Sequence, residues 1–304
     1  MKTLRVTLAL AVLAATAPAL AAETPAAAVI EGSYAGVKKD APQLTLELPA
    51  PWGTAQLAVG DPTSFAQLAR ATPGDIVRAE LHLDATGAPD RMSRLVELRR
   101  PIGATPRVLA LAGSLLGIIL VCAALSSWRP QRFVVGIDNR YSNSQLQLAL
   151  WFTAVASVYA ATVVLRIGFL GWDFTGGVGM PANLITLTGL SALSYGGAKV
   201  ITAQKVAAAA EIGQQVKTPA LRANLLRDLV TSDANRADLG DMQMMMVTLA
   251  AVAIFVVHAF ADLGELRIAH ETMLPDVDTT LLASFGIGQG AYLTKKAAQK
   301  AGDG

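Results

Sequence analysis

Five long apolar stretches constrain the fold of this chain more than any other feature of its sequence. They cover residues 108–127, 146–167, 184–202, 242–261 and 279–294, and the last is the shortest. Each is long enough to cross a hydrocarbon core as a helix, allowing for tilt and polar ends. Only 16% of the residues are charged, whereas about a quarter of a soluble domain is charged. We therefore expect a membrane α-helical bundle of about five spans in contact with a lipid bilayer.

The N-terminus has the pattern of a secretory signal. Lys2 and Arg5 form a basic end, residues 6–17 form an apolar run, and residues 19–21 provide a small-residue cleavage site. Residues 1–22 are therefore predicted to be a signal peptide. An uncleaved membrane anchor is the alternative, although the apolar run is short for a span. Either outcome exports the residues that follow.

Residues 23–106 form short alternating segments separated by turn residues, which is typical of a small β domain. Strands are expected at residues 29–37, 43–48, 55–59, 75–83 and 92–98, with a helix at 65–70 between the third and fourth. This order resembles an OB-type barrel, a fold that binds oligonucleotides, oligosaccharides or proteins on one face. Its only aromatic residues are Tyr34, Trp52 and Phe65, too few for a nucleic-acid stacking platform. We expect a protein-contact or spacer role for this exported all-β domain.

Lysine and arginine are distributed unevenly among the loops. Export of residues 23–106 makes the first span run inward and gives each later loop a predicted side. After the first span, nearly all of the basic residues in loops lie in those predicted to face inward: Arg129, Arg132, Arg140, Lys205, Lys217, Arg222, Arg227, Arg236, Lys295, Lys296 and Lys300. The outward loop 168–182 has none, and the outward loop 262–278 has only Arg267. This asymmetry predicts a bacterial inner-membrane protein with a periplasmic or extracellular N-terminal domain and a cytoplasmic C-terminus.

The second and third apolar stretches resemble the fourth and fifth, which indicates an internal duplication. Two polar sets have the same spacing, namely Asn139, Arg140 and Gln147 in one copy and Asn235, Arg236 and Gln243 in the other. A further series also matches in order: Pro181, Thr186, Leu187, Leu193, Ser194 and Gly196 correspond to Pro275, Thr280, Leu281, Ile287, Gly288 and Gly290. The copies, residues 133–205 and 231–304, would be parallel two-helix repeats because an even number of spans separates them. A general likeness between apolar hairpins is the alternative interpretation.

Two segments carry a resemblance to a known group of proteins. Residues 138–144, Asp-Asn-Arg-Tyr-Ser-Asn-Ser, lead into Gln147 and Trp151. Residues 274–282, Leu-Pro-Asp-Val-Asp-Thr-Thr-Leu-Leu, lead into Gly-Ile-Gly-Gln-Gly-Ala-Tyr-Leu at 286–293. With these segments, residues 133–300 resemble an uncharacterised group of bacterial multi-pass membrane proteins. The resemblance implies that these residues form one membrane module. It does not extend to the exported domain, and it implies no activity.

Four polar residues lie within or beside the apolar stretches, namely Gln147, Gln243, His258 and Gln289. Polar groups in a bilayer are costly and are often functional. We expect His258 to bond a neighbouring helix rather than titrate, because no carboxylate or second histidine shares its face, and Gln289 to behave similarly. Gln147 and Gln243 lie near the inner interface, where they are expected to cap or bridge the inward loop.

The last predicted span has acidic residues before it and small residues within it. Asp276 and Asp278 are expected to stabilise the start of that helix; an oligomeric carboxylate ring that attracts cations is the alternative. Small residues in the two returning helices predict close helix packing at Gly189, Gly196, Gly197, Gly286, Gly288 and Gly290. Residues 286–290 lack the Lys-Ser/Thr of a phosphate-binding loop. Nucleotide binding at this segment is therefore rejected.

Two connecting segments complete the domain organisation. Residues 107–132 comprise the first span and its junction, and residues 206–230 form a cytoplasmic loop. In that loop an apolar stripe predicts a short amphipathic helix: Leu221, Leu225, Leu226, Leu229 and Val230. The helix has three possible places, namely the inner membrane face, the surface of the repeats, or a cytoplasmic partner site.

The residues do not suggest catalysis. The sequence has no Ser/His/Asp set, no paired acid and base, and no metal-ligand cluster among its three histidines, so no catalytic, cofactor or metal site is expected. A net charge of +2 gives no indication of a nucleic-acid partner. We expect a structural or interaction protein that anchors the β domain in an envelope assembly, as a homo-oligomer or with other envelope proteins. An ion or small-solute channel or transporter is the alternative, but neither a broken helix nor a buried mid-membrane charge is evident in the sequence.

Overall fold

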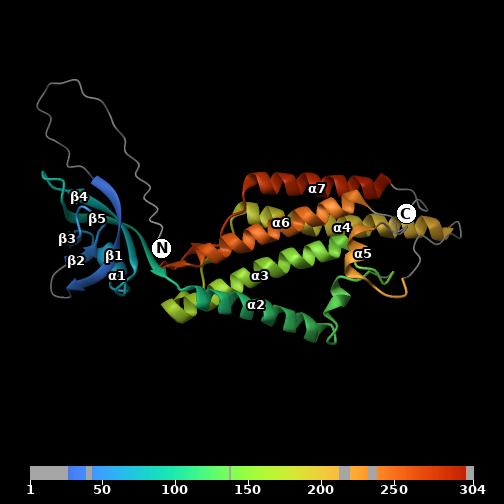
Figure 1. Ribbon diagram of the computed structural model, residues 1–304, viewed down its shortest axis with the longest axis horizontal. Coiled ribbons are helices and arrows are strands. Elements are labelled where there is room, and N and C mark those ends of the chain that lie inside the picture. The colour runs from blue at the N-terminus through green and yellow to red at the C-terminus, as the bar shows by residue number, and fades with distance from the viewer. Residues whose placement is uncertain (1–26, 39–42, 137, 212–219, 232–237, 299–304) are drawn as a thin grey trace, which may run out of the picture.

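The structure is a computed structural model that describes residues 27–38, 43–136, 138–211, 220–231 and 238–298. The molecule is elongated, with a β domain at one end and long helices along the rest of its length (Figure 1). The predicted combination of a helical part with a small N-terminal β domain is confirmed. The predicted signal peptide, residues 1–22, lies outside the described residues.

The β domain contains strands close to the predicted positions. They are β1 (Ala27–Lys38), β2 (Gln43–Glu47), β3 (Thr54–Val59), β4 (Ile76–Leu83) and β5 (Pro89–Pro101), paired in the order β3-β2-β1-β4-β5. These neighbours are antiparallel, and a short parallel pairing of β3 with β5 closes the sheet on itself. Alternating residues such as Leu44 and Leu46 of β2 fill the interior because successive side chains point to opposite faces.

Helix α1 (Pro62–Leu68) connects β3 to β4. Asp61 begins it, because its carboxylate accepts hydrogen bonds from the backbone N–H groups of Thr63 and Ser64. The helix contributes Leu68, which is fully buried, to the core of the β domain. The helix thus lies between the third and fourth strands, as predicted, although it begins three residues earlier.

The helical part contains five long helices, α2 (Ala104–Leu125), α3 (Asn143–Leu170), α4 (Ala182–Glu211), α6 (Leu239–Asp262) and α7 (Thr279–Ala298). Shorter elements connect them: η1 (Pro130–Phe133), η2 (Trp172–Phe174), β6 (Val178–Gly179), α5 (Leu225–Val230), β7 (Glu265–Arg267) and β8 (Thr272–Met273). Of the helices in the described ranges, α2, α3, α4 and α6 are long and apolar enough to cross a membrane. Helix α7 falls short because Gln289, Lys295 and Lys296 lower its hydropathy. The prediction of about five spans is therefore corrected to four such helices.

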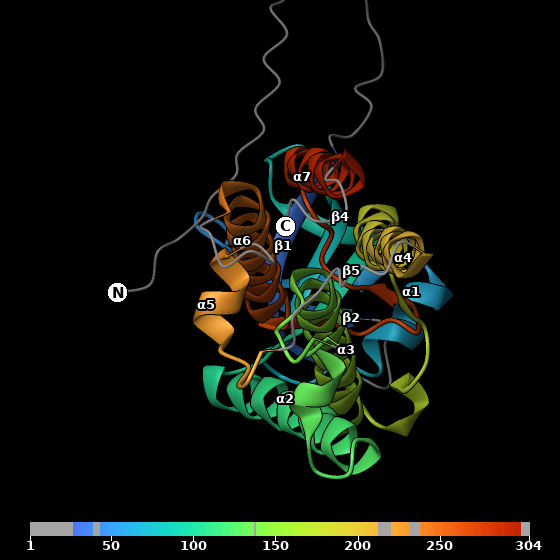
Figure 2. The ribbon, with the colours of Figure 1, turned by 90° about the vertical axis from the view of Figure 1, so that its right-hand side faces the viewer.

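Helices α3, α4, α6 and α7 form the bundle. Helix α3 packs against α4 and α6, and α7 packs against the same two helices from the other side (Figure 2). The aromatic rings of Trp151, Phe255 and Phe285 meet in the centre, where the Trp151 ring centroid lies 5.5 Å from that of Phe255 and 6.5 Å from that of Phe285. Helix α2 packs on α3 and diverges from the other helices toward its C-terminal end (Figure 1).

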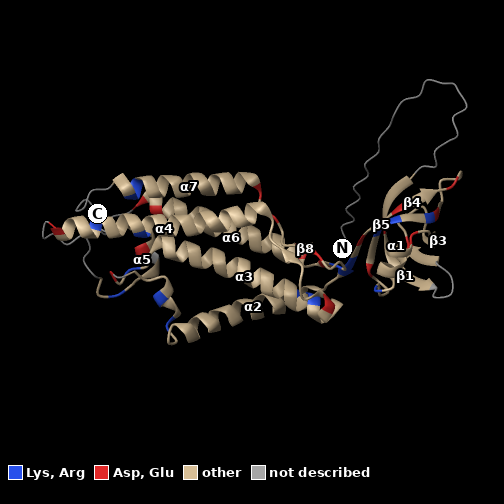
Figure 3. Ribbon diagram, turned by 180° about the vertical axis from the view of Figure 1, so that it is seen from behind, with Lys and Arg blue, Asp and Glu red and all other residues tan. Residues whose placement is uncertain are grey.

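The loops lie at two ends of the bundle. Loops 168–182 and 262–278 are at the end that carries the β domain. Residues 129–136 and 138–142, α5 and the end of α7 are at the other end (Figure 3). Strand β7, from the loop between α6 and α7, pairs with Arg99 to Pro101 of β5 and so extends the sheet of the β domain. The loops predicted to share a side thus lie at the same end of the molecule. Charged residues also concentrate at the ends of the helices (Figure 3).

Candidate functional sites at the two ends of the bundle

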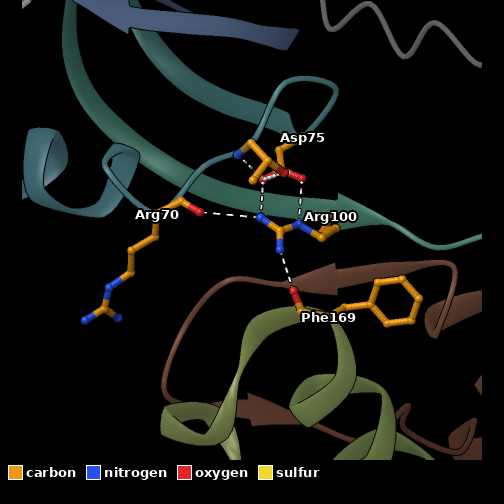
Figure 4. Close-up of polar contacts among 5 residues, drawn as sticks. Arg70, Asp75, Arg100 and Phe169 are labelled. Carbon is orange, nitrogen blue, oxygen red and sulfur yellow. Dashed lines mark hydrogen bonds and ion pairs between the residues drawn. The ribbon is translucent and has the colours of Figure 1, made fainter. Parts of the chain in front are cut away.

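The junction between the β domain and the helices contains Arg100, near the end of β5 (Figure 4). Its guanidinium donates to both oxygens of Asp75, at 2.9 Å from Nε to Oδ1 and 2.8 Å from Nη2 to Oδ2. Nη1 donates to the carbonyl of Phe169 at the end of α3, and Nη2 to that of Arg70. The hydrogen bond and charge of Asp75 outweigh the effect of burial and raise the pKa of Arg100. One side chain therefore connects the two parts of the molecule.

Arg166, in the last turns of α3, is only 1% exposed. Its Nε donates to the carbonyl of Phe174 at 2.9 Å, and Nη2 donates to the carbonyls of Ala269 and His270 at 2.9 and 3.0 Å. Both the 168–182 loop and the 262–278 loop are thereby held to α3. The ring of Phe174 stacks on that of His270 at 5.2 Å, with Arg166 and Arg70 each 5.6 Å from the Phe174 ring centroid.

An ion-pair cluster crosses the β5–β7 pairing. Glu97 pairs with Arg99 of its own strand and with Arg267 of β7, whose Nε lies 2.8 Å from Oε1. Arg99 also pairs with Glu265 at 2.9 Å. Burial by itself raises the pKa of the Glu97 carboxyl, but the hydrogen bond from Arg99 and the charges of Arg267 and Arg99 outweigh it and lower that pKa. The junction thus combines a strand pairing with charged contacts that hold its two sides together.

At the opposite end, the 138–144 segment lines a cavity of about 540 Å³ together with α4, α5 and α7. Asn139, in the left-handed backbone region at φ 54°, donates from Nδ2 to the carbonyl of Ala220 at 2.8 Å. Asp228 of α5 accepts at Oδ2 from the backbone N–H of Tyr141 at 3.2 Å. Arg140, like Asp138, is engaged in polar interactions. Of the three places left open for the amphipathic helix, these contacts match docking on the repeats.

The duplicated polar sets are only partly comparable. Asn235 and Arg236 lie outside the described residues. Gln147 and Gln243 each occupy the fifth position of their helices, but Gln147 is 1% exposed whereas Gln243 is exposed. Neither atom of the Gln147 amide has a hydrogen-bond partner within the described ranges, so Gln147 forms no bridge to the described part of the inward loop. The physical reason is that Gln147 lies one turn before Trp151 and shares its core-facing side.

His258 and Gln289 also depart from expectation. Ala251, Phe255 and Ala259 form the buried stripe of α6 and leave His258 on its exposed side. Over the described part of the chain His258 makes no hydrogen bond, so the expected bond to a neighbouring helix is wrong for the single chain. Gln289, one turn after Phe285, is 3% exposed, and its Oε1 lacks a partner within the same part of the chain.

Asp276 and Asp278 are both engaged at the start of α7. Asp278 accepts from the backbone N–H of Thr280 at 2.7 Å, and this hydrogen bond, reinforced by the Thr280 hydroxyl, lowers the pKa of the Asp278 carboxyl. Asp276 accepts from the Asn183 amide at 3.1 Å, which connects the starts of α4 and α7. These contacts correspond to the helix-start interpretation of the two carboxylates.

Only part of the predicted glycine packing is present within one chain. A Cβ atom added at Gly197 would lie 3.3 Å from Leu293, and one at Gly286 would lie 3.7 Å from Leu190, so these two glycines lie at the α4–α7 contact. The other four face open space within the described structure: Gly189, Gly196, Gly288 and Gly290. Within the described part of the single chain these four glycines make no close helix contact, because α4 and α7 meet along one face only and the glycines lie outside it. A contact with another copy stays a prediction.

Sequence reasoning missed Arg166, which lies inside the predicted span 146–167. Its position near the end of an apolar run gave the only available signal, because a charge there requires an interface or a buried set of partners. Comparison of the chain with protein-family models, with curated proteins and with solved structures finds no match. The resemblance of residues 133–300 to a bacterial membrane group thus stays a prediction.

Proposed function

We propose that this protein is a bacterial inner-membrane anchor that holds an exported OB-type β domain in a fixed position for contact with other envelope proteins or further copies of itself. The observation that carries the proposal is the junction. Arg100 links Asp75 to the carbonyl of Phe169, while β7 extends the sheet of the β domain. A flexible tether would need none of these contacts, so their presence favours a function that depends on the placement of the β domain.

Membrane insertion is supported by the distribution of apolar and charged side chains. Only 11% of the most apolar window of α2 is buried, and large residues such as Leu109, Leu116 and Val121 are exposed. Extended apolar surface of this kind requires either a partner or a lipid environment. In α2, α3, α6 and α7 the charged residues lie near the helix ends (Figure 3), as expected for segments in hydrocarbon. In α4 the first 17 residues are uncharged and the first charged residue is Lys199.

The OB-type assignment is supported by topology. The strands form the ring β1-β2-β3-β5-β4, with a parallel contact between β3 and β5 and with α1 between β3 and β4. A partly open five-stranded barrel of this kind exposes one face for ligands. With few aromatic residues on the domain, a protein contact is the occupant that we favour for that face.

The internal duplication is supported by the arrangement of the two hairpins. Like helices are neighbours, since α3 lies beside α6 and α4 beside α7. Between them, Val178 pairs with Thr272 and Gly179 with Met273 in a parallel ladder. The paired residues are 94 positions apart, as are Pro181 and Pro275. Equivalent points of the two proposed repeats thus meet in register.

The channel alternative is less well supported. Trp151, Phe255 and Phe285 fill the centre of the bundle, where a pathway between the hairpins would lie. Asp276 and Asp278 already accept hydrogen bonds from their own surroundings. Arg166 is a buried charge within α3, which the sequence reasoning had overlooked, but it lies at the end of that helix and its partners are loop carbonyls. These contacts suit a structural role.

A distance measurement between the two parts tests the proposal. In a Cys122→Ala background, spin labels at Ala85→Cys, in the β4–β5 turn, and at Ala291→Cys, on the exposed side of α7, report their separation in nanodiscs. We expect one narrow distance distribution, which Arg100→Ala broadens because it removes the contacts to Asp75 and Phe169. Arg91→Ala, which removes an exposed arginine at the far end of β5, should leave the distribution narrow. A broad distribution in the parent protein would show that the β domain is tethered, not fixed.

A further inference from the structure

The cavity at the end of the bundle away from the β domain combines donor groups and acceptor groups without partners. It lies between the start of α3, the C-terminal parts of α4 and α7, and α5. Small and apolar side chains of α4 line one wall, among them Ala198, Ala203, Val206 and Ala207. Polar residues of the 142–144 segment and of α5 line the rest. The proposed function assigns no role to this site.

The start of α3 offers free backbone donors to the cavity. Helix α3 has 28 residues, and the side chain of its N-cap residue, Ser142, makes no capping hydrogen bond. In the part of the chain that the structure describes, the backbone N–H groups of Asn143, Ser144 and Gln145 have no acceptor. Such N–H groups, together with the helix dipole, favour a bound anion.

Two lysines reinforce this positive end of the cavity. Lys199 of α4 and Lys296 of α7 line it, and neither forms an ion pair with any described carboxylate. Lys296 Nζ lies 3.3 Å from the hydroxyl of Tyr292, and Lys199 Nζ lies 5.7 Å from the Tyr195 ring centroid. Lys295, next in sequence, is instead neutralised by Asp238 and Asp241. Two ammonium groups therefore accompany the free N–H groups; the charge of Lys296 also acts on Asp241 of α6, whereas Lys199 has no described carboxylate partner.

A second, independent observation concerns buried oxygen atoms that lack donors. Asn143, 6% exposed, donates from Nδ2 to the carbonyl of Leu229, but its Oδ1 accepts from no described group. Asp228, also 6% exposed, accepts at Oδ2, while its Oδ1 has no hydrogen bond and lies 3.7 Å from Arg227 Nε. Buried polar atoms normally have a partner. The Asn143 oxygen thus requires a donor that the described chain does not supply, and the Asp228 oxygen has an ion pair with Arg227 but no hydrogen bond.

The other charged groups of the cavity have partners, although Asp238 and Asp241 share the single charge of Lys295. Asp241 pairs with Lys295 at 3.5 Å, and both Asp138 and Arg140 are engaged in polar interactions. An occupant must therefore bring an anionic group for the lysines and the helix start, and a donor for Asn143 and Asp228. An ammonium or hydroxyl group a short distance from a phosphate meets both requirements.

We propose that the cavity binds a phosphate group that carries a nearby ammonium or hydroxyl donor, as in a phosphoethanolamine headgroup or a soluble phosphate ester of the same kind. The phosphate faces the α3 N-terminus, Lys199 and Lys296, and the donor faces Asn143 and Asp228. The apolar wall of α4 accommodates the hydrocarbon part of a lipid. The lipid source rests on the proposed membrane placement, whereas binding of a soluble phosphate ester does not.

Lipid retention by purified full-length protein in detergent tests the site. We expect native mass spectrometry to detect a bound phosphatidylethanolamine and no bound phosphatidylcholine, which has the same phosphate but no N–H donor. Lys199→Ala with Lys296→Ala should weaken binding at least tenfold. Arg132→Ala removes one exposed positive charge at the same end outside the cavity and should leave binding unchanged. Asp228→Asn should reduce the difference in binding between phosphatidylethanolamine and phosphatidylcholine, because it removes the carboxylate that faces the donor.

Soluble phosphoethanolamine identifies the source of the ligand. If phosphoethanolamine displaces the bound lipid, the headgroup alone is sufficient for binding. If phosphoethanolamine binds but the protein retains no lipid, the ligand is a soluble ester. Either result supports a site for a phosphate with a nearby donor. Equal binding of the two lipids, an equal loss in Arg132→Ala and in the lysine variants, or no binding of any of these probes would overturn the proposal. None of these measurements depends on the fixed position of the β domain. A negative result for the ligand site therefore leaves the proposed anchoring function untouched, and the reverse also holds.

Discussion

At the scale of single residues, arginine side chains hold the molecule together where its segments meet. Arg100 joins β5 to the end of α3, and Arg166 joins α3 to two loops. Arginine suits this work because its planar guanidinium directs several donors at once and remains charged. Buried backbone carbonyls at chain turns need such donors, because no regular ladder supplies them.

Arg166→Leu tests this role directly. The substitution removes the donor to the carbonyl of buried Phe174 and to the partly buried carbonyls of Ala269 and His270. We expect the free energy of unfolding to fall by about 3 kcal/mol, as for the loss of a charged, multiply bonded buried group. Arg166→Lys should recover part of the loss, and Arg132→Leu, at an exposed position, should change it by under about 0.5 kcal/mol. Unfolding in a graded detergent series measures all three; equal effects at positions 166 and 132 would contradict the assigned role.

At the scale of secondary structure, the short pairing between β5 and β7 connects the β domain to the loop between α6 and α7. Strand β7 has only three residues, yet it ties the 262–278 loop to the β domain. Its stability depends on the cluster of Glu97, Arg99, Glu265 and Arg267. Charged contacts of this kind weaken when a carboxylate is protonated.

Acidification should loosen this pairing. The pKa of Glu97 is lower in the folded protein than in the unfolded chain, where it is about 4.3. Its contribution to stability is therefore complete above that value and is lost as the pH falls through the lowered folded pKa. Amide hydrogen exchange at Ile268, whose backbone N–H donates to the carbonyl of Leu98 at 2.8 Å, should accelerate over this range after correction for intrinsic rates. In the Glu97→Gln variant this amide should exchange faster already at neutral pH, and its exchange rate should depend much less on pH. An unchanged pH dependence of the exchange rate in that variant would exclude Glu97 as the titrating group.

Local sequence patterns predicted the elements of the β domain well, because alternation and turn residues determine its strands. Each predicted strand overlaps its observed counterpart, and α1 lies in the expected interval. Strand β7 escaped prediction because three residues are too few for a pattern and its partner lies more than 160 positions away. The burial of Gln147 was not predicted either. The neighbouring helices, and not its own sequence, determine which side of a uniformly apolar helix faces the core.

At the scale of the whole molecule, the sequence predicted which loops lie at the same end as the β domain. It did not predict the contacts that hold them there. The Lys/Arg asymmetry placed loops 168–182 and 262–278 together with the β domain, and all three occur at one end. The carbonyl partners of Arg166 could not be predicted, because backbone acceptors have no sequence signature. The cavity beside residues 142–144 also needed the fold, which brings α4, α5 and α7 to that segment.

The proposed function requires helices that cross a membrane with the β domain outside the cytoplasm. Cysteine accessibility in intact cells tests this placement most directly. In a Cys122→Ala background, Ala85→Cys lies in the β4–β5 turn and Leu221→Cys at a fully exposed position near α5, at the opposite end. An impermeant thiol reagent added from outside the inner membrane should label position 85 and should label position 221 only after the membrane is opened. Labelling of position 221 in intact cells, or equal labelling of both positions, would contradict the account.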